Sequence, residues 1–345
     1  MSTLQLGLAG VGVLVVAGVA AYGAWSSRRN APRQAQPEPL EPHDDDAAVA
    51  PGGPRLDPVF DAGLSSLPLP EKRPGLDALI DVIAPVALDG VVSGEAALAA
   101  LPPTRRAGSK AFAVEGLNES TEVWEAPAPG QRYSAFQAGV QLANRTGALN
   151  EIEYSEFVMK TQAFADAING APEFPEMLEE VARARELDQF AGAHDAQLTF
   201  TLRARHAAWS PGYLQQNASR LGFVAGVIPG RMVIPANAPG APPVLSLAFD
   251  SQAALAEDPA QSAIREVVLS LDAPQVHRSE QPFARMREAA AALAEAMDGV
   301  ITDDNGHAVP TEALDGIGAD LERLYDTLDA RELSAGSPQA RRLFS

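Results

Sequence analysis

An uncharged apolar run from Leu4 to Trp25 constrains this chain more than any other feature of its sequence. About 20 consecutive apolar residues make a helix long enough to cross a hydrocarbon core of roughly 30 Å. Tyr22 and Trp25 lie at one end of the run, where aromatic rings favour the lipid headgroup region. The run has no polar face of the kind that a helix at the surface of a soluble domain carries. We therefore predict a transmembrane helix over residues 4–25, in contact with membrane lipid.

The charges around this run predict its orientation. Arg28, Arg29 and Arg33 follow it, whereas only the amino terminus precedes it. Positive residues stay in the cytoplasm, so residues 1–3 should be periplasmic and the rest of a single-pass inner-membrane protein cytoplasmic. A secretory signal has the reverse order, with basic residues before the apolar run, and an uncleaved anchor is therefore favoured. The sequence leaves open whether the span self-associates.

The next residues, 26–74, are expected to be a flexible cytoplasmic linker. Their segment QAQPEPLEPHDDDAAVAPGGP is rich in proline, alanine and acid, and so buries too little apolar surface to fold. About forty such residues would separate the folded part from the bilayer by some 35 Å on average. The chain has a net charge of −19 and no cysteine, which argues against nucleic acid as a partner and excludes disulfides and thiolate chemistry.

Residues 193–330 are predicted to form an α+β domain. Alternation of apolar and polar residues marks strands in AQLTFTLRAR, PPVLSLAFD and EVVLSLDAP, in which Leu245, Leu247 and Phe249 should face inward. Ser210 and Pro211 begin a first helix. Further helices are expected from near Gln281 and Pro310. The order β-α-β-β-β-α-β-α gives a largely antiparallel sheet with helices on one side.

Small residues dominate the other face of that predicted sheet. It carries Thr199, Ser246, Ala248, Val268 and Ser270, and no predicted helix remains to cover it. Such a surface is either a platform for an apolar peptide or an ordinary solvated face.

Two further segments of the chain have less defined expectations. Residues 75–192 have a similar order of elements, which suggests an α+β domain that is a diverged duplicate. Residues 331–345 end in the basic and apolar sequence RRLF, which is expected to be exposed, as a frayed terminus or a short docking peptide.

No pattern in the sequence supports catalysis. The five histidines are scattered without metal-ligand spacing, and we find no phosphate-binding loop, dinucleotide fingerprint or nucleophile elbow. We therefore expect no catalytic residue, no cofactor, no bound metal and no small-molecule substrate.

The arrangement of the chain resembles the ZipA family, bacterial membrane anchors for the division polymer FtsZ. The resemblance lies in the N-terminal span, the Pro-rich acidic linker, the stretch QLTFTLRARHAAWSPGYLQQNASRLGF, and the run from Val267 to Asp304. It implies an α+β domain that binds the FtsZ C-terminal peptide at the division septum.

The resemblance also implies which residues contact that peptide. The family has a large apolar side chain where Ser270 stands and a methionine where Asp250 stands, and Phe249 or Met232 could replace the lost apolar contact. The peptide-binding positions that follow are Ala248, Asp250, Gln252, Val268, Ser270, Ile228, Thr199, Phe249 and Met232. The alternatives are a scaffold of the same fold with another protein client, and an envelope enzyme or solute-binding protein with an uncleaved signal.

Overall fold

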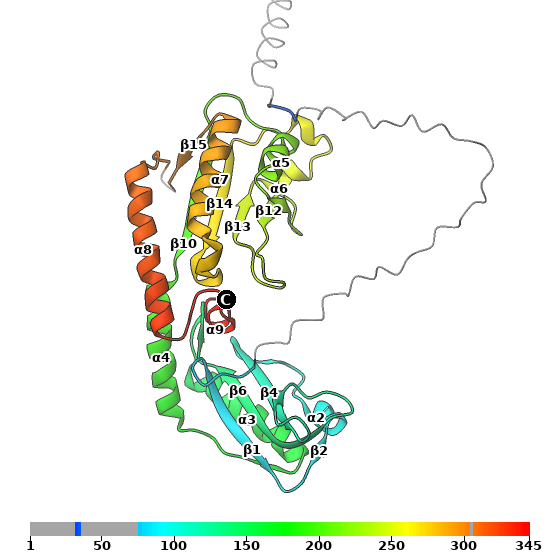
Figure 1. Cartoon of the computed structure of the whole chain (residues 1–345). Helices are drawn as coiled ribbons and strands as arrows, with labels where there is room; N and C mark the ends of the chain where they lie inside the picture. Colours follow the sequence, from blue (N-terminus) through cyan, green and yellow to red (C-terminus); the bar gives the residue numbers. More distant parts are fainter. Residues whose placement is uncertain (1–31, 36–74, 304–305) are drawn as a thin grey trace, which may run out of the picture. The chain divides into compact units, whose positions relative to one another are not determined.

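The computed structural model describes residues 32–35, 75–303 and 306–345, and these divide into two compact units (Figure 1). Each unit is built from segments that are separated in the sequence. The first unit comprises residues 75–198, 272–282 and 315–345, and the second comprises 32–35, 199–271, 283–303 and 306–314. The sequence predicts that residues 75–192 and 193–330 fold as two consecutive domains, and this stays a prediction.

The first unit contains an antiparallel sheet with the strand order β3-β4-β6-β1-β9, with β2 beside β6 and β5 beside β4. Helix α3 packs on one face, where Phe157 lies 6.1 Å from Phe112 and Phe164 lies 5.3 Å from Phe136 between ring centroids. The elements are β1 Asp81–Leu88, β2 Val92–Ser93, α2 Gly94–Ala100, β3 Arg106–Ala107, β4 Lys110–Asn118, β5 Trp124–Glu125, β6 Arg132–Gln141, β7 Ala143–Asn144, β8 Gly147–Ala148, α3 Glu151–Ala167, β9 Gly170–Pro172, α4 Met177–His194 and α9 Pro338–Leu343.

The second unit has a sheet with the strand order β11-β12-β13-β14-β10-β15. Strand β10 runs antiparallel to β14, because Ala204 N–H donates to Arg265 O at one end and Ala273 N–H donates to Ala196 O at the other. Ala290 and Leu293 of α7 lie against the apolar side chains of Phe200, Leu247 and Leu269 on one face. The elements are β10 Gln197–Ala204, α5 Pro211–Ser219, β11 Val224–Ala225, β12 Arg231–Ile234, β13 Leu245–Ala248, α6 Ser251–Ala254, β14 Glu266–Asp272, α7 Pro282–Met297, β15 Gly299–Thr302 and α8 Thr311–Ala330, which is shared between the units.

A serine caps the first helix of each unit, and the sequence predicts the helix start at Ser210. Ser93 Oγ accepts the Ala96 N–H at 3.3 Å at the start of α2. Ser210 Oγ accepts the Tyr213 N–H at 3.2 Å at the start of α5, with Pro211 at the first helical position. Each serine satisfies one of the backbone donors that the first helical turn leaves unpaired.

The two sheets share one topology. The path β4-β6-β1-β9 of the first unit corresponds to β13-β14-β10-β15 of the second, with antiparallel neighbours throughout. In chain order, a helix follows the first of the four strands in each path: α2 follows β1, and α5 follows β10. A second helix precedes the last of the four strands: α3 precedes β9, and α7 precedes β15. The α+β prediction is confirmed, and the duplication stays a prediction.

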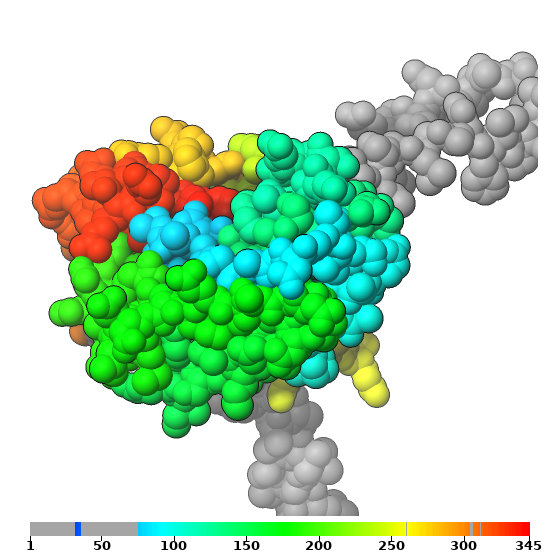
Figure 2. Space-filling view, turned by 90° about the horizontal axis from the view of Figure 1, so that it is seen from below, coloured from blue at the N-terminus to red at the C-terminus, as the bar shows by residue number. Residues whose placement is uncertain are grey.

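The residues after α8 are part of the first unit, so the expectation of an exposed RRLF end is wrong. Helix α9 follows Ser337, and its last residue, Leu343, and the next residue, Phe344, are 0% and 1% exposed. Burial of these two apolar side chains removes them from water, which favours their fixed position. Figure 2 shows the C-terminal residues in red beside the blue residues at the start of this unit.

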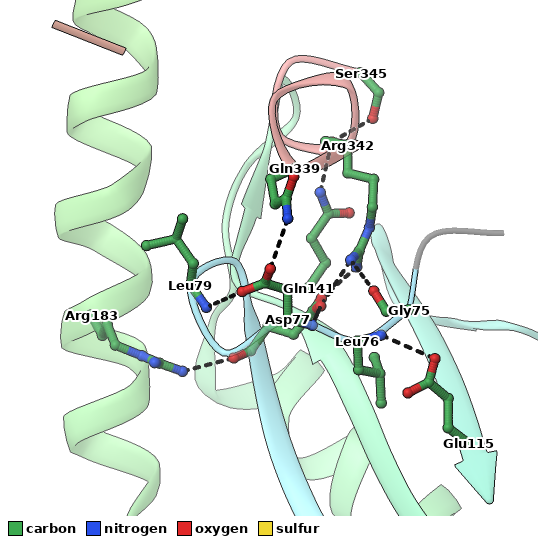
Figure 3. Close-up of polar contacts among 11 residues, drawn as sticks. Gly75, Leu76, Asp77, Leu79, Glu115, Gln141, Arg183, Gln339, Arg342 and Ser345 are labelled. Atoms are coloured by element: carbon green, nitrogen blue, oxygen red, sulfur yellow. Dashed lines mark hydrogen bonds and ion pairs between the residues drawn. The ribbon is translucent and has the colours of Figure 1, made fainter. Parts of the chain in front are cut away.

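A buried carboxylate connects this C-terminal segment to β1 (Figure 3). Asp81 is 0% exposed, and its Oδ2 accepts hydrogen bonds from Arg342 Nη1 and from the Asp77 N–H, each at 2.9 Å. Gln339 Nε2 donates to Asp77 Oδ2 at 2.9 Å, and Arg183 Nη2 donates to Asp81 O at 2.8 Å. Burial raises the pKa of Asp81, while the hydrogen bond and charge of Arg342 oppose that shift.

The predicted transmembrane span over residues 4–25 lies outside the described residues. Within residues 32–35, 75–303 and 306–345, no helix is long and apolar enough to cross a membrane. Of the predicted linker 26–74, only residues 32–35 are described, and Arg33 among them forms backbone hydrogen bonds with the second unit.

Candidate functional site

One face of the second sheet is open, and its residues come from neighbouring strands. Ala248 of β13 pairs with Val268 of β14, and Ser246 pairs with Ser270 in the same register. Successive side chains alternate between faces, so these four lie on the side opposite to the Leu247 side chain and α7. Val268 is 37% exposed, and Ser246, Ala248 and Ser270 are half-buried. We call this surface, together with Thr199 and Val233, the open face.

The open face is small and uncharged at its centre. Its serine, alanine and valine side chains leave the backbone accessible to a partner, and Ser270 Oγ donates to Ser246 O at 3.4 Å. Charged residues lie at its end, where Arg203 Nε is 3.1 Å from Glu266 Oε1. A surface of this kind suits apolar contact with an extended or helical peptide, with charges at the rim.

A hairpin of apolar residues continues the open face at the edge of the sheet. Val224 of β11 pairs with Val233 of β12, which places both on the same side. Val224 and Ile228 are 51% and 55% exposed, and Val227 in the turn between the strands is fully exposed. Ile228 is among the predicted contact residues, whereas Val224 and Val227 are not. The consecutive apolar residues of FVAGVIPG, too short for a core strand, were the signal that could have identified them.

Two of the predicted contact residues lie beyond the strand in which they were expected. Strand β13 ends at Ala248, and Asp250 is the N-cap of the short helix α6, where its Oδ1 accepts the Gln252 N–H at 2.9 Å. Asp250 and Gln252 are exposed, but their positions are set by this cap and not by the alternation of a strand. The Asp250 carboxylate therefore has a local structural role.

Met232 and Phe249 lie on the covered side of the sheet, which removes them from the candidate site. Met232 pairs with Leu247, and the two are 4% and 0% exposed. Phe249 follows the same alternation and is 9% exposed. Neither side chain can replace a lost apolar contact on the open face, because each contributes to the core on the opposite side. Ala248, Val268, Ser270 and Thr199 are the predicted residues that the structure brings together.

The equivalent face of the first unit is covered by the chain itself (Figure 3). Leu76 lies over Gly139 of β6 so closely that a Cβ on that glycine would be 2.5 Å from its methyl group. The Leu76 N–H donates to Glu115 Oε1 at 3.1 Å, and Gln137 Nε2 donates to Glu115 Oε2 at 2.9 Å. Both Glu115 and Gln137 are on the face away from α3. The two units therefore differ in the surface that corresponds to the open face.

Other types of site find little support in the described structure. Among residues 32–35, 75–303 and 306–345, no group of three or more His, Asp or Glu side chains could hold a metal ion. A cavity of about 490 Å³ lies in the first unit and is lined in part by Asp188, Asp195 and Arg145. Arg145 is already occupied, since it donates to Asp195 Oδ2 and Asp272 Oδ2 at 2.8 Å each. This ion-pair network is complete within the protein.

A comparison with known families agrees with the resemblance seen in the sequence. Residues 252–319 match the family model described as ZipA, C-terminal FtsZ-binding domain. The match begins in α6 and includes β14, α7 and β15, and so covers Val268 and Ser270 of the open face but not β10, β12 or β13. It supports a ZipA-like protein and an FtsZ-binding role in cell division, the role of a protein-binding domain. No curated protein matches the chain.

Proposed function

We propose that this protein holds FtsZ polymers at the inner membrane by binding the FtsZ C-terminal peptide on the open face. The match of residues 252–319 to an FtsZ-binding domain carries this proposal. The exposed Val268 of β14 and the half-buried Ala248 of β13 support it, because apolar contact is the chemistry such a surface offers. The N-terminal apolar run supplies the membrane attachment in the proposal.

The polar residues of the open face predict modest affinity for a single peptide. Ser270 and Ser246 offer less apolar area than large aliphatic side chains would, and a missing apolar contact weakens binding by about 1–3 kcal/mol. A filament presents many copies of its peptide, so weak single contacts sum to a strong attachment. The exposed Val224, Val227 and Ile228 add apolar area beside the face.

A peptide titration tests the proposed site. Fluorescence anisotropy of a labelled FtsZ C-terminal peptide, with the full chain in detergent, should give saturable micromolar binding. Ala248→Asp and Val268→Asp should each weaken it about tenfold or more, because a carboxylate would lose water against an apolar ligand. Ala113→Asp is the matched control, since Ala113 is exposed on β4 of the first unit. Absence of binding, or equal loss in all three variants, would refute the proposal.

The orientation in the membrane can be tested separately. The chain has no cysteine, so Ser219→Cys provides one exposed thiol at the end of α5. In intact cells, a thiol reagent that cannot cross the inner membrane should leave this position unlabelled until the membrane is opened. Labelling from the periplasm would favour the envelope enzyme or solute-binding protein instead.

A further inference from the structure

Residues 32–35, which we call the docking segment, add to the second unit as an extra strand would. The Arg33 N–H donates to Ala208 O at 2.7 Å, and the Ser210 N–H donates to Arg33 O at 2.9 Å. Arg33 thereby forms a parallel bridge with Trp209, which pairs on its other side with Ile264 in an antiparallel bridge. Addition of an extended segment to exposed backbone groups is a common way in which proteins bind peptides.

The Arg33 side chain makes a second set of contacts at the end of α7. Its Nη1 donates to Met297 O at 3.2 Å, and its Nη2 donates to Asp298 Oδ2 at 2.9 Å. The Trp209 Nε1–H also donates to Met297 O, at 2.7 Å. The last carbonyl groups of a helix lack intrahelical donors and attract positive charge. An arginine therefore matches this position in both hydrogen bonding and charge.

The residues that receive the docking segment are buried. Ala208, Trp209 and Ser210 are 1%, 0% and 2% exposed, and Pro32 of the segment is buried as well. Buried backbone groups need hydrogen-bond partners, and Arg33 is the partner of Ala208 O and of the Ser210 N–H. The docking segment thus completes the second unit.

We infer that the docking segment holds the second unit close to the inner membrane. The length of residues 36–74 then does not affect the distance between the membrane and the second unit. This inference rests on the proposed function for its membrane span, residues 4–25. Seven residues, 26–32, then separate the span from the docked position, and they extend to at most about 25 Å. A connection through all of the predicted linker would instead place the unit about 35 Å away on average, with a wide spread.

Disulfide crosslinking tests the docked position directly. A Cβ built on Gly212 would lie 3.8 Å from the Ala35 Cβ, with no other neighbour within 4 Å, and this separation is the usual one in disulfides. The full chain in native membranes, carrying Ala35→Cys and Gly212→Cys, should crosslink on mild oxidation. The control pair is Ala35→Cys with Ser219→Cys, because seven helical residues place Ser219 about 10 Å further along α5.

Charge reversal at Arg33 supplies the second part of this test. Arg33→Glu should lower the crosslinked fraction roughly tenfold, because it replaces two charge-assisted donors with a carboxylate beside Asp298. Gln34→Glu, a matched change at an exposed neighbour, should leave it unchanged. Equal crosslinking in the Gly212 and Ser219 pairs, or no effect of Arg33→Glu, would overturn the docked position.

Spacer insertions test the consequence for distance. About ten Gly/Ser residues inserted between Trp25 and Pro32 should increase the average distance of the second unit from the bilayer by about 8 Å. The same spacer inserted within residues 36–74 should not move it. The readout is energy transfer from a dye on Ser219→Cys to a lipid dye, and equal changes for both insertions would refute the inference. Crosslinking without peptide binding would refute the proposed function alone.

Discussion

The buried ion pair between Asp81 and Arg342 should be the most sensitive interaction in the first unit. Asp81 is fully buried and the Arg342 side chain is 21% exposed, so Arg342→Ala leaves a carboxylate in the interior without its main partner. Removing one partner of a buried pair destabilises a protein by about 3–5 kcal/mol. The Asp77 N–H remains bonded to Asp81, and we therefore expect a loss near 3 kcal/mol, at the lower end of that range.

The size of this loss should depend on pH. Burial raises the folded-state pKa of Asp81 above its unfolded value, so between the two values the folded state binds more protons. Stability of the parent protein therefore rises as the pH falls through the folded-state pKa, until it reaches the unfolded value. Arg342→Ala removes a group that lowers the pKa of Asp81, so Asp81 should become protonated at a higher pH in the variant. Protonation removes the unpaired buried charge and so reduces the loss of stability. The difference between variant and parent should shrink as the solution becomes acidic.

Native-state hydrogen exchange can assign the effect to one unit. A loss near 3 kcal/mol corresponds to about 150-fold faster exchange of the protected amides in β1 and β6. The amides of β13 and β14 in the second unit should be unaffected. Asp81→Asn combined with Arg342→Met is the control, because it removes both charges and should recover much of the loss. An Arg342→Ala variant with exchange within threefold of the parent would show that the pair contributes little.

Four other substitutions test the local structure, each by thermal or urea denaturation. Gly230→Ala should destabilise the second unit by about 2 kcal/mol or more, because Gly230 has a φ of +78° and an added Cβ would lie 2.6 Å from Phe249 O. An unchanged stability would contradict the backbone conformation at Gly230. Ser210→Ala should cost about 1–2 kcal/mol, and Ser93→Ala about 0.5 kcal/mol, because the first cap is buried and the second is exposed. Equal losses would contradict that reasoning. Phe157→Ala should cost about 3–5 kcal/mol, since the side chain is 0% exposed in the core of the first unit, and a smaller loss would imply that the core rearranges.

Much of the fold could be predicted because local periodicity carries it. The alternation in PPVLSLAFD assigned Leu245 and Leu247 to the core and Ala248 to the other face, and the structure has them there. The same alternation placed Phe249 inward, which is inconsistent with its selection as a contact residue. Family resemblance alone gave Phe249 as a contact position, whereas the strand alternation determines the face on which its side chain lies.

The features that the sequence analysis missed depend on distant contacts. Arg33 is embedded in a Pro-rich acidic segment whose average composition predicts no folded structure, and its binding position depends on backbone groups at Ala208 and Ser210. Arg342 pairs with an aspartate 261 residues away. Neither partner is visible in local patterns of charge or hydropathy. The Asp250 cap, by contrast, is a local signal that could have been read from the sequence.

The interleaved segments of the first unit have a consequence for protein synthesis. Its last sheet strand, β9, ends at Pro172, but the unit also needs Arg342 and Phe344. At about 5–20 residues per second, a ribosome reaches these residues roughly 10–30 s after completing β9. During that interval Asp81 lacks its cation, and the apolar surface that later covers Phe344 faces water. The nascent first unit should therefore be a target for chaperones, while residues 199–271 and 283–314 of the second unit are synthesised within this same interval.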